Sequence, residues 1–292
     1  MVRFAQMRYS PLTMRQRCAA LAVLLFPVVL LSGIQVKLRA VKPELVQERL
    51  QGYRGNDTRR EATLKGFFEA AGCTGGQLTE QAVKGLKQPN LICVLPGDTD
   101  SVIVVGAHYD HVNAGDGVVD NWSGASLLPS LYEALKEGSR RYTLVFAGFA
   151  GEEKGLIGSR YYVKNMPAEK LKKVRAMICL DTLGLGPTEV WVSISDKELI
   201  ATIGSLAHAA NLPVSRVDVD GVGMSDEEPF LAAKIPIIMF HSVSRNTLSI
   251  LHTSRDNYKA LKFDDYYTSY RLLSGYLNYL DQTLSANPSP PK

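Results

Sequence analysis

The chain has 292 residues, of which 46% are apolar, so it can bury one large core, and we expect a single domain. It carries 33 basic and 29 acidic residues, a formal net charge of +4. Seven of the basic residues precede the first acidic residue, Glu44, and without them the balance is 26 basic against 29 acidic, or −3. The basic character therefore belongs to the N-terminal segment, and no nucleic-acid partner is predicted.

The N-terminus has the pattern of a membrane-targeting element. Residues 1–17 contain four arginines and no acid, and an apolar stretch runs from residue 18 to 34. Its length lies between those of a signal peptide and a spanning helix, so residues 18–36 are predicted to be a transmembrane signal-anchor or a signal peptide. No clear cleavage signal follows, which favours the anchor. The arginine excess predicts a cytoplasmic N-terminus and an extracytoplasmic (periplasmic or extracellular) domain, secreted if the segment is cleaved.

The four cysteines form neither a C-x-x-C pair nor a zinc-finger spacing. Cys18 lies in the apolar segment and Cys179 in a predicted buried strand, which leaves Cys73 and Cys93 as the plausible pair. In an exported domain these two could form a disulfide. Two unconnected thiols are the alternative.

Beyond the N-terminal segment, residues 37–60 read as a linker and first helix, residues 61–283 as one domain, and the Pro-rich residues 284–292 as a disordered tail. Apolar runs at residues 101–107, 142–149, 174–180 and 235–240 predict buried strands, and helical patterns alternate with them. This alternation predicts an α/β fold, a single domain with a central, mostly parallel mixed sheet covered by helices on both faces.

Polar side chains follow three of the predicted strands directly. His108 ends the first, Glu152 and Glu153 follow the second, and Asp181 follows the third. Because sites in open α/β sheets form beyond the carboxyl ends of the strands, these side chains should meet at one edge. Asp120 lies in a loop between the first two strands and should face the same crevice.

The loop containing Asp120 leads into a predicted helix. Leucines at helical spacing follow it, and Ser123 is the expected N-cap. Pro129 lies within the pattern and should kink the helix or shift its start.

A hydrolytic zinc site needs nitrogen and oxygen ligands, an open position for water, and a base that takes the proton of that water. Two metals close together also need a bridging ligand, for which a carboxylate is suited. Glu152 is the candidate base, and the candidate ligands are His108, Asp120, Glu153, Asp181 and His252.

Five motifs, ordered along residues 108–253, carry a family resemblance. They are His108-Tyr109-Asp110, Asp120-Asn121-x-Ser123-Gly124, Gly151-Glu152-Glu153-x-Gly155-Leu156-x-Gly158-Ser159, Leu180-Asp181 and His252-Thr253. In this order they resemble the M28 zinc peptidases. The resemblance implies Asp120 as the bridging ligand, His108 and Asp181 on one zinc, and Glu153 and His252 on the other. It makes Glu152 the general base and Asp110 the carboxylate that receives the second ring N–H of the ligand histidine.

This resemblance implies a zinc-dependent exopeptidase with two ions per chain, most simply an aminopeptidase acting on peptides with a free N-terminus. Met224-Ser225-Asp226-Glu227-Glu228 departs from the pattern, because relatives often have histidine where Glu227 stands. As a hypothesis, these acids favour basic side chains or a free amine in the substrate. His111 and His241 lie near the predicted crevice and could contact substrate.

Three alternatives remain at this stage. A glutaminyl-peptide cyclase, a single-zinc acyltransferase of similar fold, would use the positions of Asp120, Glu153 and His252. A non-catalytic binding domain of the same fold is opposed by the complete set of ligands and base. Carboxypeptidase or dipeptidase specificity also remains open.

Overall fold

A computed structural model describes residues 28–31, 33–218 and 223–285. Its strands are β1 (Val28–Leu31), β2 (Ile34–Lys37), β3 (Leu78–Gln81), β4 (Asn90–Leu95), β5 (Val102–His108), β6 (Thr143–Phe149), β7 (Val174–Leu180), β8 (Glu189–Trp191), β9 (Ser215–Val217) and β10 (Ile237–His241). Its α-helices are α1 (Pro43–Leu50), α2 (Asp57–Ala71), α3 (Ser123–Leu135), α4 (Ile157–Lys164), α5 (Ala168–Leu171), α6 (Lys197–Ala210), α7 (Glu228–Ala232) and α8 (Phe263–Thr283).

A mixed sheet of eight strands, in the order β3-β4-β6-β5-β7-β10-β8-β9, forms the centre of the fold. The four middle strands β6, β5, β7 and β10 are parallel, whereas β4 and β8 run antiparallel to their inner neighbours. The four runs predicted as buried strands coincide with these parallel strands to within two residues. Both faces are covered, so such strands are continuously apolar.

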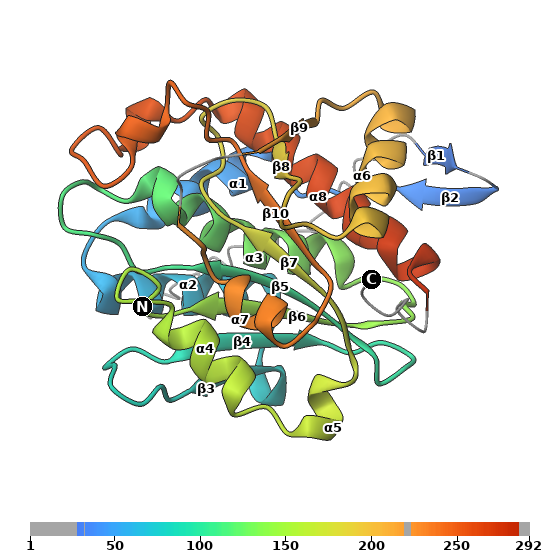
Figure 1. Ribbon diagram of the computed structural model, residues 1–292, viewed down its shortest axis with the longest axis horizontal. Helices are drawn as coiled ribbons and strands as arrows, with labels where there is room; N and C mark the ends of the chain where they lie inside the picture. The colour runs from blue at the N-terminus through green and yellow to red at the C-terminus, as the bar shows by residue number, and fades with distance from the viewer. Residues whose placement is uncertain (1–27, 32, 219–222, 286–292) are drawn as a thin grey trace, which may run out of the picture.

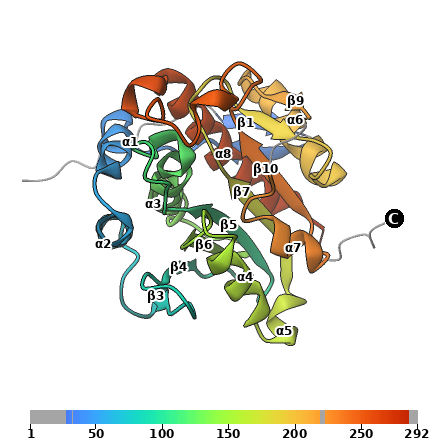
Figure 2. The same ribbon diagram turned by 60° about the vertical axis from the view of Figure 1, so that its left-hand side comes forward.

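Helices cover both faces of the sheet (Figures 1 and 2). Helices α1, α2, α3, α6 and α8 pack on one face and enclose the larger apolar cluster, to which β5 contributes Val105 and Ala107. Val104 of the same strand points to the other face, where α4, α5 and α7 close a second cluster around Phe149 and Phe230. Alternate side chains of β5 therefore enter two different apolar cores. The helices on both faces of a mixed sheet confirm the predicted α/β fold class.

The segment predicted to be a membrane-spanning element is only partly described, since residues 18–27 and 32 lie outside the described residues. Where it is described, the prediction of a helix is wrong: β1 and β2 form an antiparallel hairpin, joined through Gly33 with φ of 81°. β-Branched valine and isoleucine favour extended backbone, and Val36 is buried against the domain. Among the described residues, no helix is both long and apolar enough to cross a bilayer.

Helix α3 begins at Ser123, but Ser123 does not act as the predicted N-cap. Its hydroxyl donates to the backbone carbonyl of Val119 at 2.6 Å and accepts from the backbone N–H of Leu183 at 2.9 Å. The side chain therefore connects the helix start to the segment after β7. The helix runs through Pro129 without a break in its assigned span.

A disulfide joins Cys73, just after α2, to Cys93 in β4. It closes a segment with a sequence separation of 20 residues and connects a helix on one face to the sheet. Cys179 is a buried free thiol in β7, and Cys18 lies outside the described residues.

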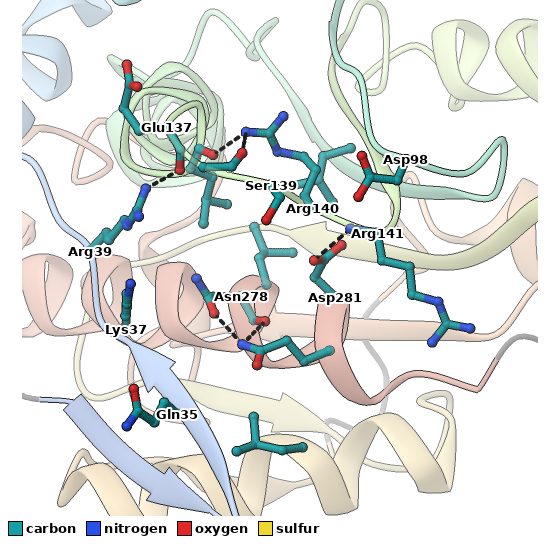
Figure 3. A pocket seen from close by; sticks show the side chains of 16 residues that line it. Gln35, Lys37, Arg39, Asp98, Glu137, Ser139, Arg140, Arg141, Asn278 and Asp281 are labelled. Atoms are coloured by element: carbon teal, nitrogen blue, oxygen red, sulfur yellow. Dashed lines mark hydrogen bonds between the residues drawn. The ribbon is translucent and has the colours of Figure 1, made fainter.

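A cavity of about 720 Å³ lies at the end of the sheet where β5 and β6 begin, between β2, the end of α3 and α8 (Figure 3). One of the cations that line it, Arg140, is hydrogen-bonded to backbone carbonyls. The guanidinium donates to the carbonyl oxygens of Pro96, Leu135, Lys136 and Gly138 at 2.7–2.9 Å. Because the last carbonyls of a helix have no partner within the helix, Arg140 caps the end of α3, and its Nη1 and Nη2 atoms are engaged within the protein.

Loss of the disulfide should destabilise the domain measurably. For the Cys73→Ala, Cys93→Ala double variant we expect the free energy of unfolding in urea to fall by about 3 kcal/mol, because the unfolded chain regains loop entropy. Dithiothreitol should lower the stability of the parent protein to a similar degree and leave the double variant unchanged. A parent protein whose unfolding midpoint is insensitive to dithiothreitol would contradict the prediction.

Candidate metal centre

The predicted site residues meet at the carboxyl ends of the parallel strands. His108 is the last residue of β5 and pairs in register with Phe149 at the end of β6, so Glu152 and Glu153 follow on the adjacent strand. Asp181 comes directly after β7, on the other side of β5. Asp120 and His252 arrive from longer loops. The structure therefore brings together all five predicted ligands and the predicted base.

Asp120 lies between the two histidines. Its Oδ1 is 3.3 Å from Nε2 of His108, and its Oδ2 is 3.1 Å from Nε2 of His252. Asp181 Oδ1 lies 3.7 Å from His108 Nε2, and Glu153 Oε2 lies 3.2 Å from His252 Nε2. These residues form two sets that share Asp120: His108, Asp120 and Asp181, and Asp120, Glu153 and His252. Within each set the ligand atoms lie within 4.8 Å of one another.

The donor atoms fit metal binding. His108 Nε2 and Glu153 Oε1 are both buried and have no hydrogen-bond partner among the described residues. Buried polar atoms are rarely left unpaired, because each costs about 1–3 kcal/mol. Imidazole nitrogen and carboxylate oxygen are ligand types that zinc accepts in a catalytic site. A cation in each set would therefore use atoms that the protein leaves without a partner.

Backbone clamps hold Asp120 in this central position. The carboxylate of Asp256, from the loop after His252, accepts the N–H of Val119 at 2.8 Å and of Asp120 at 3.1 Å. The amide of Asn121 donates to the carbonyl of Leu180 at 2.8 Å, and the Asp120–Asn121 peptide bond is cis. Asp256 was not among the predicted site residues, because its only local signal is an acid four residues after a candidate ligand.

Asp110 acts on a different group from the one predicted. Its carboxylate oxygen lies 3.7 Å from His108 Nδ1, whereas its backbone carbonyl lies 3.2 Å from the same nitrogen. The carboxylate instead accepts the backbone N–H of Glu152 at 3.1 Å and of Glu153 at 3.3 Å. Asp110 thus fixes the ring of His108 through its main chain and the two glutamates through its side chain.

The carboxylate of Asp181 is oriented by two hydroxyl groups that the sequence analysis did not identify. Thr182 Oγ1 donates to Oδ1 at 2.8 Å, and Ser225 Oγ donates to Oδ2 at 2.6 Å. Ser225 is distant in sequence and becomes a partner only in the folded chain. Its neighbours Asp226 and Glu227 are buried outside the cavity lining, and Glu228 pairs with Arg160 at 3.0 Å.

Crowding of charge shifts the protonation of the site. Burial, together with the neighbouring carboxylates, raises the pKa of Glu152 to about 9 and that of Glu153 to about 7. The hydrogen bond to Asp120 raises the pKa of His252 to about 9. Burial lowers the pKa of His108, but Glu152, Asp120 and Asp181 outweigh it and hold that pKa well above its usual value. Burial opposes ionisation of Asp120, yet the two histidines lower its pKa.

A cavity of about 340 Å³ opens beside these groups. Asp120, Glu152, Asp181 and His252 form its polar side. The rest of its lining is mainly apolar and includes Trp191, Met224, Met239, Val243, Leu248 and Leu251, together with His241, Thr182 and Ser225. The arrangement can place the backbone of a peptide at the metal-binding groups and one side chain against the apolar wall.

Comparison with known proteins identifies relatives of the same fold. The chain is 33% identical over 177 residues to leupeptin-inactivating enzyme 1 of Streptomyces exfoliatus, which covers 60% of this chain but only 40% of that enzyme. The LapA aminopeptidase of Legionella pneumophila superposes with a TM-score of 0.76 at 22% identity, over 84% of this chain and 73% of LapA. A glutaminyl cyclase from an Acidobacteriales bacterium superposes with a TM-score of 0.65 at 19% identity, over 82% of this chain and 93% of the cyclase.

The sequence model of peptidase family M28 matches residues 90–276, which is more than half of the chain. This span contains His108, Asp120, Glu152 with Glu153, Asp181 and His252, so the match covers the assembled site and every strand of the central sheet except β3. The chain therefore belongs to peptidase family M28.

Proposed function

We propose that this protein is a zinc-dependent aminopeptidase that holds two zinc ions and hydrolyses N-terminal residues from peptides. The observation that carries the proposal is the position of Asp120, whose two carboxylate oxygens face the two histidines at 3.3 and 3.1 Å. One carboxylate shared between two sets of ligands is the arrangement that a two-metal site requires.

In this proposal Asp120 would hold both ions when they are bound. His108 and Asp181 complete one site, and Glu153 and His252 complete the other. When bound, the ions would polarise the scissile carbonyl and lower the pKa of the attacking water. Membership of peptidase family M28 and the likeness to the LapA aminopeptidase support a peptidase, and the donor set supports zinc.

Glu152 is the proposed general base. Its carboxylate lines the cavity but, unlike that of Glu153, is not close to His252, and its Oε2 lies 3.9 Å from His108 Nε2. It is therefore placed to take the proton from water and deliver it to the leaving amine. The N–H of Glu152 is held by Asp110 at 3.1 Å, which fixes the start of the side chain.

The second candidate is a glutaminyl-peptide cyclase, favoured by the superposition over 93% of that relative. A single ion would use Asp120, Glu153 and His252, which are close together here. The second complete set around His108 and Asp181 favours the two-ion peptidase over this alternative.

We also propose that the domain works in an extracytoplasmic, oxidising compartment. The Cys73–Cys93 disulfide supports this, because such bonds persist mainly in exported proteins. A membrane anchor or export signal would belong to the residues before Val28, which lie outside the described part.

Replacing the base should separate catalysis from metal binding. For Glu152→Gln we expect kcat on leucine p-nitroanilide to fall by about 10²–10⁴-fold, because proton transfer is lost while the proposed ligands remain. Zinc content, measured by atomic absorption after titration of the metal-free protein, should stay at two ions per chain.

Glu228→Gln is the matched control, since Glu228 pairs with Arg160 and does not line the cavity. It should leave kcat within about twofold of the parent value. No hydrolysis by the parent protein at any zinc level, with one ion bound tightly, would refute the aminopeptidase proposal. Cyclisation of N-terminal glutamine would then be the reaction to measure.

Zinc affinity should rise with pH. In the metal-free protein the pKa of Glu153 is about 7 and that of His252 about 9, so at pH 7 protons occupy ligand atoms that the metal needs. As the pH increases from 7 toward 9, these groups lose their protons before zinc binds. Zinc then has no protons to displace, and its apparent affinity increases. Calorimetry with chelator-buffered zinc, in buffers of different ionisation enthalpy, measures the number of protons released when zinc binds. This number should be smaller in His252→Ala than in the parent protein. An affinity that is constant from pH 6.5 to 8.5 would contradict this account.

A further inference from the structure

Arg60 is a buried cation of α2 to which the proposed mechanism gives no part. Its side chain is 0% exposed. Within the described part of the chain, its hydrogen-bond partners are all main-chain carbonyl groups. Burying a charge is unfavourable unless polar groups surround it, so the position of these carbonyls matters to the fold.

The guanidinium of this residue holds both ends of one loop. The loop consists of residues 109–119 and joins the predicted ligands His108 and Asp120; we call it the inter-ligand loop. Nη1 donates to the first carbonyl of the loop, that of Tyr109, at 3.2 Å. Nη2 donates to the carbonyl of Gly117 at 2.8 Å and to that of the residue before it. One side chain therefore connects the two ends of the loop to each other.

The guanidinium is itself held in place. Nε donates to the carbonyl of Tyr53, just before α2, at 2.9 Å, and Cζ lies 5.5 Å from the centre of the Trp122 ring. From Tyr109 to Gly117 the backbone forms no helix or strand, so its carbonyls have no partners from regular structure. Arg60 supplies such partners from a neighbouring helix.

The charge of Arg60 is present throughout the neutral pH range. Burial lowers its pKa to about 10, and the carboxylates of Asp57, Asp256, Asp110 and Asp116 oppose this effect. Two of these acids, Asp110 and Asp256, also accept backbone N–H groups of the ligand segments. The cation is therefore surrounded by the groups that hold the metal centre together.

Arg60 and Asp256 connect Asp120 to different parts of the centre. Asp256 comes from the loop after His252 and accepts the N–H of Asp120, so the relative position of Asp120 and His252 does not require Arg60. The hydrogen bonds of Arg60 instead connect the segment before Asp120 to the residue after His108, at the end of β5. Loss of Arg60 should therefore disturb one ligand set more than the other.

We propose that Arg60 is a positioning residue for the metal centre. It fixes Asp120 relative to His108 and Asp181 through the inter-ligand loop, and so sets the affinity of the ion that these three residues would bind. The inference rests on the proposed two-zinc site and extends it to a residue that contacts neither ion nor substrate.

Arg60→Lys tests the proposal, because lysine keeps the charge but lacks the planar fork that reaches both ends of the loop. We expect the affinity for one of the two zinc ions, measured by competition with a chelator, to fall about tenfold. In Asp181→Asn, which already lacks a ligand of that ion, Arg60→Lys should cause little further loss. In the metal-free variant, the backbone amides of the inter-ligand loop should exchange hydrogen for deuterium faster than in the parent protein.

Arg140→Lys is the matched control. Arg140 (Figure 3) also donates to four main-chain carbonyls, but at the opposite end of the sheet. Both variants should lower the stability to urea, whereas only Arg60→Lys should change the zinc affinity and the exchange of the loop. Equal losses of stability, with zinc affinity and loop exchange at the parent values in both variants, would mean that Arg60 only stabilises the fold and would overturn the proposal.

The parent protein provides a measurement that does not require a variant to fold. If Arg60 supports the zinc site, zinc must stabilise the hydrogen bonds of Arg60 in return, because coupling between two sites is reciprocal. NMR of the arginine Nε–H groups should show slower hydrogen exchange at Arg60 after zinc is added. Arg49, a buried arginine bonded to Ser130 and Glu133, is the internal reference and should not change. An exchange rate at Arg60 that zinc leaves unaltered would contradict the proposal.

Failure of the proposed function gives a different result from failure of this inference. If the parent protein binds two zinc ions but hydrolyses no peptide, the aminopeptidase proposal fails, and the two affinities still decide the role of Arg60. If the protein binds only one ion, the two-zinc proposal fails. Loop exchange in metal-free Arg60→Lys then decides the inference, and a rate equal to that of the parent protein refutes it.

Discussion

The carboxylate of Asp120 faces one histidine with each of its two oxygens, and the remainder of the centre is arranged around that shared position. Glu153 and Asp181 flank it on opposite sides, so several negative charges lie within a few ångströms in a largely buried place. Burial raises the pKa values of Glu152 and Glu153, and the repulsion between the neighbouring carboxylates adds to that effect. A cation in each of the two ligand sets would relieve this repulsion. The donor atoms and the electrostatics of the centre therefore both favour metal binding.

Maintaining such an arrangement requires partners that hold each group in place. Asp256 and Asn121 hold the segment of Asp120 through its backbone and its neighbour, and Asp110 holds the segment of the two glutamates. These contacts join the carboxyl ends of β5, β6 and β7 to one another. They keep the ligands in position without using the ligand atoms themselves, which remain directed toward the centre.

The same strand ends also shape the substrate cavity. β7 places Asp181 at its polar side, and the adjacent β10 places Met239 and His241 at its apolar side. Both sides of the cavity therefore depend on neighbouring strands of one sheet, packed between two apolar clusters. At the other end of the sheet, Arg140 in the lining of the larger cavity caps the end of α3, so size alone does not identify the functional cavity.

Much of the site follows from the sequence alone, because buried parallel strands read as continuous apolar runs and the residue after each run must lie at the shared edge. This pattern predicted His108, Glu152 with Glu153, and Asp181, and the loop after the first strand added Asp120. His252 entered through its donor type and the ordered motifs. The prediction of a spanning helix was wrong for residues 28–37, which form a hairpin. An apolar, β-branched run is compatible with both helix and strand until its packing partner is known.

Only the tertiary structure decided which groups hold the ligands. Asp256 contacts the backbone of Asp120 across 136 residues of chain, and Ser225 contacts Asp181 across 44. Neither contact leaves a local pattern in the sequence. Sequence specifies local conformation and burial, whereas the direction of each hydrogen bond depends on distant groups that meet only on folding.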